Sequence, residues 1–358
     1  MKRLSITLQD IAERENLLLA TWKASRGKQQ RPAVKHWLER LDENLSTLAV
    51  AILEGRAPMA GLRRFAIFDP KPREISVHAF ADRVLHHAIL NPAEARFEQM
   101  LVPSSFACRP GKGVHAAVAT AQGQLRRWRW LGQVDVASYF ASIDHAELMA
   151  LLHSRFKGEG LMKLLQRIVS SGAVDGAVHG LPIGALTSQH FANAYLDAAD
   201  RWLLSHKAVR GHVRYMDDIA WWCDGPQEAQ AIHAGLTEML WQQRRLRLKP
   251  GWHHGPSSRG MAFCGFRIRA GVVLPSHRKL KRYREGARRL MQAADGQWGV
   301  EAMQEASLQR AHDALAATLA HTQSLHFRQG VWAGCYGPEC IPDCRPESTM
   351  PNALESTP

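Results

Sequence analysis

The sequence predicts an α+β fold in which helices alternate with short antiparallel strands. Apolar residues recur at intervals of three and four between Val34 and Leu53, the pattern of one amphipathic helix. Strand-forming residues on both sides of a short polar step at residues 211–223 predict a β-hairpin. A further strand is predicted at residues 131–135. The 358 residues are enough for two or three subdomains with a well-buried core.

The remaining elements follow from the same periodicities and from their punctuation by glycine and proline. Gly55 is expected to end the helix that starts at Val34. A Gly-rich link is expected at residues 171–180, after a mostly helical region. The other predicted elements are helices at 7–25, 82–90, 116–130, 227–244 and 278–290, and strands at 65–68 and 263–268.

The chain is strongly basic. Its 46 Lys and Arg residues against 33 Asp and Glu give a net charge of +13 and an isoelectric point near 9.8. The hydrophobic fraction of 46% is ordinary for a globular protein. A basic surface on a normally apolar chain indicates a polyanionic partner such as nucleic acid. Charge alone leaves open a basic protein with no such partner.

The chain starts without the apolar segment of a signal peptide, and no stretch approaches the roughly 18 apolar residues of a membrane span. Six cysteines without a secretory signal indicate free thiols in a reducing compartment. We therefore expect a cytoplasmic protein with no membrane partner. Cys335, Cys340 and Cys344 invite a zinc site, but their spacings of five and four match no common knuckle, so metal binding there stays open.

Basic residues project from an extended segment and the helix after it. Two prolines hold residues 69–76 extended, so Lys71 and Arg73 project from a stiff, β-like segment. The helix predicted at residues 82–90 places Arg83 one turn from His86 and His87. Groups placed in this way could clamp a triphosphate, although a solvated surface role stays open for each of them.

Two glycine-containing segments could approach a ligand through their backbone. The loop at residues 104–113 carries Arg109 but lacks the ending of a Walker P-loop, which excludes a P-loop nucleotide hydrolase. The loop could still bring Arg109 to a phosphate chain. Further on, Thr187 or Ser188 is the expected N-cap of a helix, and Gly184 keeps the approach to its N-terminus open.

Two adjacent acids, Asp217 and Asp218, lie at or beside the turn of the predicted hairpin. Neighbouring carboxylates repel, and folds that present them together usually neutralise them with a divalent cation. The pair alone is also typical of an ordinary acidic turn. Asp135 ends a predicted strand, and neighbouring strands of one antiparallel sheet would bring all three carboxylates together. Such a set can hold two Mg²⁺ ions roughly 4 Å apart, the arrangement that activates a 3′-hydroxyl and stabilises a leaving pyrophosphate.

The helix at residues 278–290 has a heavily basic face that includes Arg278, Lys281 and Arg282. Cations near a helix N-terminus oppose the helix dipole, so a phosphate partner explains this face better than helix stability does. A merely solvated face is the alternative.

Six motifs in this order resemble those of reverse transcriptases: Arg73-Glu74-Ile75, residues 135–140, residues 184–189, Tyr215-Met216-Asp217-Asp218, Leu248-Lys249 and residues 263–266. Most of these enzymes have Ser-Pro where this chain has Ser188-Gln189. The Gly-x-x-x-Ser-Gln version, with residues 82–88 and 107–113, resembles the reverse transcriptases of diversity-generating retroelements, within the group II intron and retron-like bacterial superfamily. The resemblance runs from about residue 10 to residue 330.

The resemblance implies a right-hand polymerase with fingers, a ferredoxin-like antiparallel palm and a helical thumb. The implied boundaries are fingers at 1–130, palm at 131–270 with a fingers insertion near 146–180, thumb at 271–335 and a loose C-terminal tail at 336–358.

It also implies a role for each matching residue. Asp135 and Asp217, with the Val136 backbone, would be the principal ligands of two Mg²⁺ ions, with Mn²⁺ as an alternative, and Asp218 the third carboxylate. Lys249 is the candidate proton donor to pyrophosphate. The nucleotide would be held by Arg83, by either Lys71 or Arg73, by Tyr139 as the gate against a 2′-hydroxyl, and by Phe140, Gly184, Ser188 and Gln189. Template and primer would meet Arg109, Ile183, Tyr215, Met216, Gly265 in the primer grip, and Arg278, Lys281 and Arg282.

Members of the resembled family copy a template-repeat RNA into cDNA with errors at adenines, for mutagenic retrohoming into a variable target gene. The implied partners are template RNA, primer or cDNA, deoxynucleoside triphosphates and a small basic accessory protein, the accessory variability determinant. A faithful reverse transcriptase of retron or group II intron type is the nearest alternative. A nucleic-acid-binding protein that keeps a polymerase fold without catalysis is a more distant one.

Overall fold

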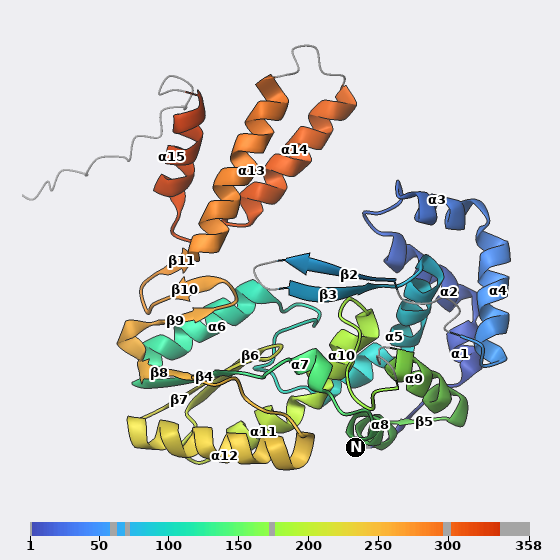
Figure 1. The fold of residues 1–358 in the computed structure, drawn as a ribbon, viewed down its shortest axis with the longest axis horizontal. Coiled ribbons are helices and arrows are strands. Elements are labelled where there is room, and N and C mark those ends of the chain that lie inside the picture. Colours follow the sequence, from blue (N-terminus) through green and yellow to red (C-terminus); the bar gives the residue numbers. More distant parts are fainter. Residues whose placement is uncertain (1, 58–62, 69–71, 172–175, 296–301, 337–358) are drawn as a thin grey trace, which may run out of the picture. The chain divides into compact units, whose positions relative to one another are not determined.

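A computed structural model describes residues 2–57, 63–68, 72–171, 176–295 and 302–336 of the chain. The chain divides into two compact units, Met1–Gly260 and Met261–Pro358 (Figure 1). Both contain helices and sheets, as the predicted α+β class requires. The boundaries of fingers, palm and thumb stay predictions. None of the described helices is long and apolar enough to cross a membrane.

Helices open the first unit. Strand β1 (Leu4–Ser5) leads into α1 (Leu8–Ala12), α2 (Arg14–Ser25), α3 (Pro32–Glu39) and α4 (Leu41–Leu53). The prediction of one continuous helix from Val34 to Leu53 is wrong, because the backbone at Arg40 leaves helical geometry with φ −119° and ψ 40°. Trp37 before the break and Leu48 after it are both buried, so the apolar periodicity was correct although the helix is broken.

A two-stranded antiparallel ribbon follows, made of β2 (Arg63–Phe68) and β3 (Pro72–Val77). It confirms the predicted strand at residues 65–68 and the predicted extended backbone from Pro72 onward, while residues 69–71 lie outside the described residues. Helix α5 (Phe80–Met100) is longer than predicted and contains Pro92, and α6 (Val114–Arg127) comes next.

The central sheet of the first unit has four antiparallel strands in the order β6-β7-β4-β8. These are β4 (Trp130–Asp135), β6 (Gly211–Tyr215), β7 (Asp218–Cys223) and β8 (His253–Pro256). Helices α11 (Asp197–Ser205) and α12 (Pro226–Arg244) pack along it (Figure 1). Trp221 and Trp222 of β7 are fully buried. Gly132 on β4 has to be glycine, since a Cβ there would collide with the Trp221 ring.

Short elements connect β4 to the rest of this sheet. They are α7 (Tyr139–Ser142), α8 (His145–Arg155), β5 (Phe156–Lys157), which pairs in parallel with β1, α9 (Glu159–Ser171) and α10 (Leu186–Tyr195). Ala185 is the N-cap of α10, so the prediction of Thr187 or Ser188 as the cap is wrong. Both of these side chains are buried in the first turn of the helix, which starts earlier than expected.

The second unit contains a three-stranded antiparallel sheet and helices. Its strands are β9 (Met261–Phe263), β10 (Phe266–Ile268) and β11 (Val273–Pro275), in the order β11-β10-β9. The helices are α13 (His277–Asp295), α14 (Ala302–Ala317) and α15 (Leu325–Tyr336). Tyr283 and Ala287 of α13 are buried while its Lys and Arg residues are largely exposed, which confirms the predicted one-sided basic helix. Cys340 and Cys344 lie outside the described residues.

Candidate active site

Two of the three predicted acids lie on neighbouring strands, and the third lies in the adjoining turn. Asp135 is the last residue of β4 and Asp218 the first of β7, and the two are direct partners in the antiparallel register. Tyr215 also pairs with Asp218, so Met216 and Asp217 form the tight turn between β6 and β7. The predicted hairpin and the predicted adjacency of Asp135 to the acid pair are therefore both present.

The carboxylates repel one another. Asp218 has a pKa raised to about 7, first because the group is buried and then because Asp135 and Asp217 carry like charges. A hydrogen bond from Gln133 Nε2 to Asp218 Oδ1, 2.7 Å long, opposes this rise. Gln133 comes from the same strand as Asp135 but was not predicted, because a glutamine two residues from an acid carries no signal in the sequence.

Lys249 lies beside the acids. Its Nζ is 3.2 Å from Asp135 Oδ1, and its backbone N–H donates to the Asp135 carbonyl at 2.8 Å. An isolated bridge between Val136 and Leu248 continues this pairing. The segment before Pro250 is thus held along the end of β4, and the ammonium group already supplies one positive charge to Asp135.

The donor set fits a divalent cation. Asp135, Asp217, Asp218 and the Val136 carbonyl supply the hard oxygen ligands that Mg²⁺ prefers, and burial with like charges leaves Asp218 short of a counter-charge. In the part of the chain that the structure describes, no three His, Cys, Asp or Glu side chains form a ready-made metal site. Lys249 Nζ, 3.2 Å from Asp135 Oδ1, lies where it would compete with a cation for that oxygen.

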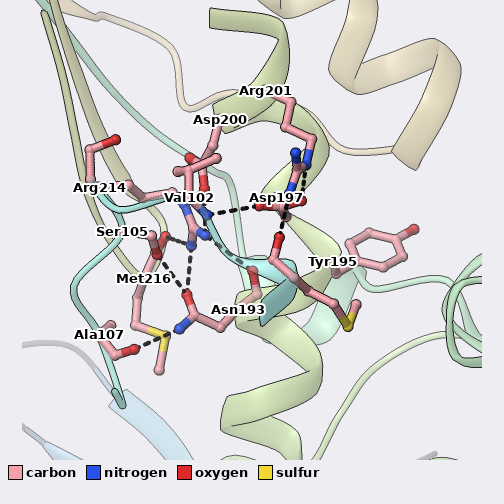
Figure 2. Close-up of polar contacts among 12 residues, drawn as sticks. Val102, Ser105, Ala107, Asn193, Tyr195, Asp197, Asp200, Arg201, Arg214 and Met216 are labelled. Carbon is pink, nitrogen blue, oxygen red and sulfur yellow. Dashed lines mark hydrogen bonds and ion pairs between the residues drawn. The ribbon is translucent and has the colours of Figure 1, made fainter. Parts of the chain in front are cut away.

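A buried polar network holds the turn that carries Asp217. The guanidinium of Arg214, on β6, is fully buried against Asp200, with Nε at 2.7 Å from Oδ1 and Nη2 at 2.7 Å from Oδ2. It also donates to Asn193 Oδ1 at 2.8 Å and to the Met216 carbonyl at 3.1 Å (Figure 2). Met216 has φ of 54°, a left-handed conformation that costs a non-glycine residue roughly 1 kcal/mol. Arg214 therefore stabilises the strained turn through its hydrogen bond to the Met216 carbonyl.

The same network extends to the loop before α6. Asn193 Nδ2 donates to the Ala107 carbonyl at 2.6 Å, and the Val102 N–H donates to Asp197 Oδ1 at 3.3 Å (Figure 2). Arg201 pairs with Asp197 at 2.5 Å. None of these residues was predicted as part of the site, because all of these bonds except the Arg201–Asp197 pair join positions far apart along the sequence.

The segment before α10 exposes Ile183 and Gly184 at its tip. Ile183 is 37% exposed, and Gly184 has φ of 113°, which favours glycine. Ser188 is buried, whereas Gln189 is partly exposed and its Oε1 lies 3.4 Å from the Cys108 thiol. Ser188 and Gln189, on which the resemblance to one subtype depends, thus differ in burial.

Arg109 is held by partners within the protein. Its guanidinium donates to Glu98 at distances from 2.5 to 2.9 Å and to the carbonyls of Val102 and Ser105. The side chain is only 6% exposed. These bonds fix the loop at residues 104–113 and leave the predicted contact of Arg109 with template or phosphate without support.

The two aromatic residues after Asp135 also differ. Tyr139 is buried in the core, its hydroxyl donates to the Ala192 carbonyl, and burial raises its pKa well above the usual value. Phe140 packs against the same core but keeps part of its surface exposed. A sugar could not reach the Tyr139 ring without displacing the core, so this geometry does not support Tyr139 as the gate.

The predicted triphosphate residues are only partly described. Lys71 lies outside the described residues, and Arg73 pairs in register with Ile67 on the β2–β3 ribbon. The Arg83 guanidinium donates to the Ala24 carbonyl at 3.0 Å and lies 5.5 Å from the centre of the Phe80 ring. Arg83 is also close to Lys28 and Arg31, which the site prediction missed although the basic turn after α2 was visible in the sequence.

The predicted template and primer residues occur in both units. Tyr215 and Met216 are half-buried at the hairpin. In the second unit, Gly265 has φ of 76° in the turn between β9 and β10. The exposed side chains of Arg278, Lys281 and Arg282 lie at the start of α13.

A buried histidine next to this site predicts acid sensitivity. His86 of α5 lies 3.0 Å from Thr187 Oγ1, and burial lowers its pKa from 6.5 to about 3. The unfolded chain takes up a proton near pH 6.5 while the folded chain does not, so stability is full above pH 6.5 and falls as the pH drops toward 3. We expect a loss of about 3 kcal/mol at roughly pH 4.5 from this group.

Urea unfolding of the whole protein between neutral pH and about pH 4.5 measures this loss. His86→Asn, which keeps a hydrogen-bonding group near Thr187, should show a correspondingly smaller decline. An identical decline in both proteins would rule out His86 as the source.

Comparison with known proteins places this site in a family. Residues 69–251 match the family model described as reverse transcriptase (RNA-dependent DNA polymerase). The chain is 29% identical over 193 residues to Protein YkfC of Escherichia coli (strain K12), across 51% of this chain and 49% of that protein.

Proteins associated with introns are also similar to this chain. It is 24% identical over 174 residues to the group II intron-encoded protein LtrA of Lactococcus lactis subsp. cremoris, across 46% of this chain and 29% of LtrA. It is 25% identical over 141 residues to an uncharacterized 91 kDa protein in the cob intron of Schizosaccharomyces pombe, across 38% of this chain and 18% of that protein. The chain thus spans about half or less of the length of these curated relatives.

Proposed function

Because this chain belongs to the reverse transcriptase (RNA-dependent DNA polymerase) family, we propose that it is an RNA-directed DNA polymerase. The observation that carries the proposal is the register pair of Asp135 and Asp218, with Asp217 in the adjoining turn. The net charge of +13 suits a nucleic-acid substrate. A fold kept only for binding would not need three acids at one end of a sheet, because carboxylates repel the phosphates of nucleic acid.

In this proposal each group acts on the growing strand or the incoming nucleotide. Two Mg²⁺ ions held by Asp135, Asp217, Asp218 and the Val136 carbonyl would activate the primer 3′-hydroxyl and stabilise the leaving pyrophosphate. Lys249 would donate a proton to the pyrophosphate from its position beside Asp135. Gly184 and Ile183 would pack on the nascent base pair.

We assign the gate against ribonucleotides to Phe140 rather than to Tyr139, since Phe140 keeps exposed surface. Phe140→Ala should raise the incorporation of ribonucleotides relative to deoxyribonucleotides by about tenfold or more, because the space for a 2′-hydroxyl opens. Single-nucleotide extension with each substrate class measures the ratio. Tyr139→Phe, which removes only a core hydroxyl, is the matched control and should leave the ratio unchanged. If Tyr139→Phe raised the ratio and Phe140→Ala did not, the gate would be assigned to Tyr139.

The finer proposal is a reverse transcriptase of a diversity-generating retroelement. It rests on Ser188-Gln189 and on the glycine-containing segment before them, in agreement with the sequence resemblance. In this role the enzyme copies a template-repeat RNA into cDNA with errors at adenines, together with a small basic accessory protein. The contact of Cys108 with Gln189 and the exposed Ile183 supply places where the template base could be held loosely.

Sequencing the cDNA copied from a defined RNA tests the subtype. We expect errors concentrated opposite adenines, and fewer of them when Ile183 is replaced by a residue of different size. An even error rate opposite all four bases would favour a faithful enzyme of group II intron type, to which the similarity with LtrA points. A protein that binds RNA but never extends a primer would instead support a non-catalytic binding role.

A further inference from the structure

The outer face of α2 carries an exposed aromatic residue that the proposed polymerase site does not use. Trp22 is 58% exposed, and Leu19, one turn earlier, is 44% exposed. The guanidinium of Arg26 lies over the indole, 5.1 Å from the ring centroid. Stacking on one side leaves much of the ring available to solvent or to a ligand. A large apolar ring displayed beside a cation is typical of surfaces that receive a nucleobase.

The segment that carries this ring is basic and has no acid nearby in the sequence. Between Asn16 and Leu38 the chain has five Lys or Arg residues and no Asp or Glu. Lys28 follows α2 after Gly27, and Arg31 is tied to it by a hydrogen bond from its N–H to the Lys28 carbonyl at 2.9 Å. Arg83 reaches this corner from α5, where it donates to the Ala24 carbonyl in the last turn of α2.

The cations are close enough to disturb one another. Burial lowers the pKa of Lys28, and the charges of Arg83 and Arg31 lower it further. Burial and Arg31 lower the pKa of Arg83 in the same direction. Such an arrangement is unfavourable for folding alone, and a phosphate group between these cations would relieve the repulsion.

We propose that Trp22 and Arg26, with Lys28, Arg31 and Arg83, form a stacking platform for single-stranded nucleic acid. One unpaired base lies on the Trp22 ring while the cations hold the adjoining phosphates. In a duplex the base faces are already stacked on each other, so the platform selects a single strand. For an RNA-copying enzyme that strand is the template that has not yet been paired, and this assignment of the strand rests on the proposed function.

A single helix links the platform to the template segment of the proposed active site. Helix α5 carries Arg83 and, one turn later, His86, whose Nδ1 lies 3.0 Å from Thr187 Oγ1. Thr187 lies three residues after Gly184. Helix α5 therefore contacts both the C-terminal end of α2, through Arg83, and the first turn of α10, through His86.

Fluorescence anisotropy of a labelled single-stranded RNA of about 12 nucleotides tests the platform. The full chain is used without Mg²⁺ and without nucleotides, so the measurement does not depend on polymerase activity. Trp22→Ala should weaken binding by about 5- to 100-fold, the range for loss of one stacked base, and Trp22→Phe should recover most of it. Lys28→Gln should lower the salt dependence of binding by about one phosphate contact.

Trp241 provides the matched control. It is 41% exposed and has the Arg247 guanidinium 4.9 Å from its ring centroid, but it belongs to α12. Trp241→Ala should leave RNA affinity unchanged. Equal weakening by both substitutions, or unchanged affinity of Trp22→Ala, would overturn the proposal. Thermal unfolding of each variant confirms that the exposed substitution leaves the fold intact.

A DNA strand of the same sequence separates the two possible single strands. Weakening by Trp22→Ala on both RNA and DNA supports a platform that reads base faces without the 2′-hydroxyl. Weakening on DNA alone would overturn the assignment to the template RNA. These binding measurements do not use primer extension. A failure of the polymerase proposal can therefore be distinguished from a failure of the platform.

Discussion

Replacement of Asp217 by Asn is expected to abolish RNA-templated DNA synthesis, with a decrease of at least about 10³-fold, or roughly 4 kcal/mol of transition-state stabilisation. The substitution keeps the size of the side chain but removes the negative charge that would hold a metal ion. Without that ion, the negative charge that develops in the transition state would not be stabilised. Primer extension on a defined RNA with Mg²⁺ measures the loss. Binding of single-stranded RNA should be retained, since removal of an acid does not repel phosphates.

Asp224→Asn is the control for this experiment. Asp224 follows the same strand, β7, and pairs with Arg210 at 2.9 Å on the surface, with 48% of its side chain exposed. Its substitution should leave extension within about twofold of the unsubstituted protein. If Asp217→Asn retained activity comparable to this control, the acids of the hairpin would not be the catalytic groups.

Replacement of Arg214 by Met is expected to destabilise the protein by about 3–5 kcal/mol. Arg214 and Asp200 are both fully buried, so removal of the guanidinium leaves an uncompensated carboxylate in the interior. His212 Nε2, at 3.1 Å from Asp200 Oδ1, supplies at most part of the missing interaction. Urea unfolding at neutral pH measures the change in the free energy of unfolding.

Two further variants give this prediction its controls. Arg210→Met removes an arginine just before β6, the strand that carries Arg214. Its partner Asp224 is exposed, so we expect the free energy of unfolding to fall by less than about 1 kcal/mol. Arg214→Lys keeps the charge but not the bonds to both Asp200 and Asn193, and should fall between the two. Equal losses for Arg214→Met and Arg210→Met would contradict a structural role of the buried pair.

The parts of the fold encoded by local pattern were predictable. Alternating apolar residues around Asp217 and Asp218 predicted the hairpin, and one antiparallel sheet was enough to bring Asp135 beside it. The broken helix at Arg40 was not predictable, because the apolar periodicity continues across the break. The start of α10 was missed since polar residues that resemble caps can also lie buried in the first turn, as Thr187 does against His86.

The roles of individual cations and aromatic residues were harder to predict, because burial depends on distant partners. Arg109 was expected on a ligand, yet Glu98 and two carbonyls hold it. Arg214 was read only as a strand residue, although Asp200 and Asn193 make it the centre of a buried network. Tyr139 and Phe140 are neighbours of similar character, and only their packing distinguishes them.

The register of β4 against β7 couples the geometry of the acids to the packing of the core. Side chains alternate between the two faces of a sheet, so a slip by one residue would move Asp218 away from Asp135 and also turn the buried Trp221 and Trp222 to opposite faces. Both faces of β7 are buried, so a variant that lost the alignment would misfit the two indole rings in the core and lose stability together with the site.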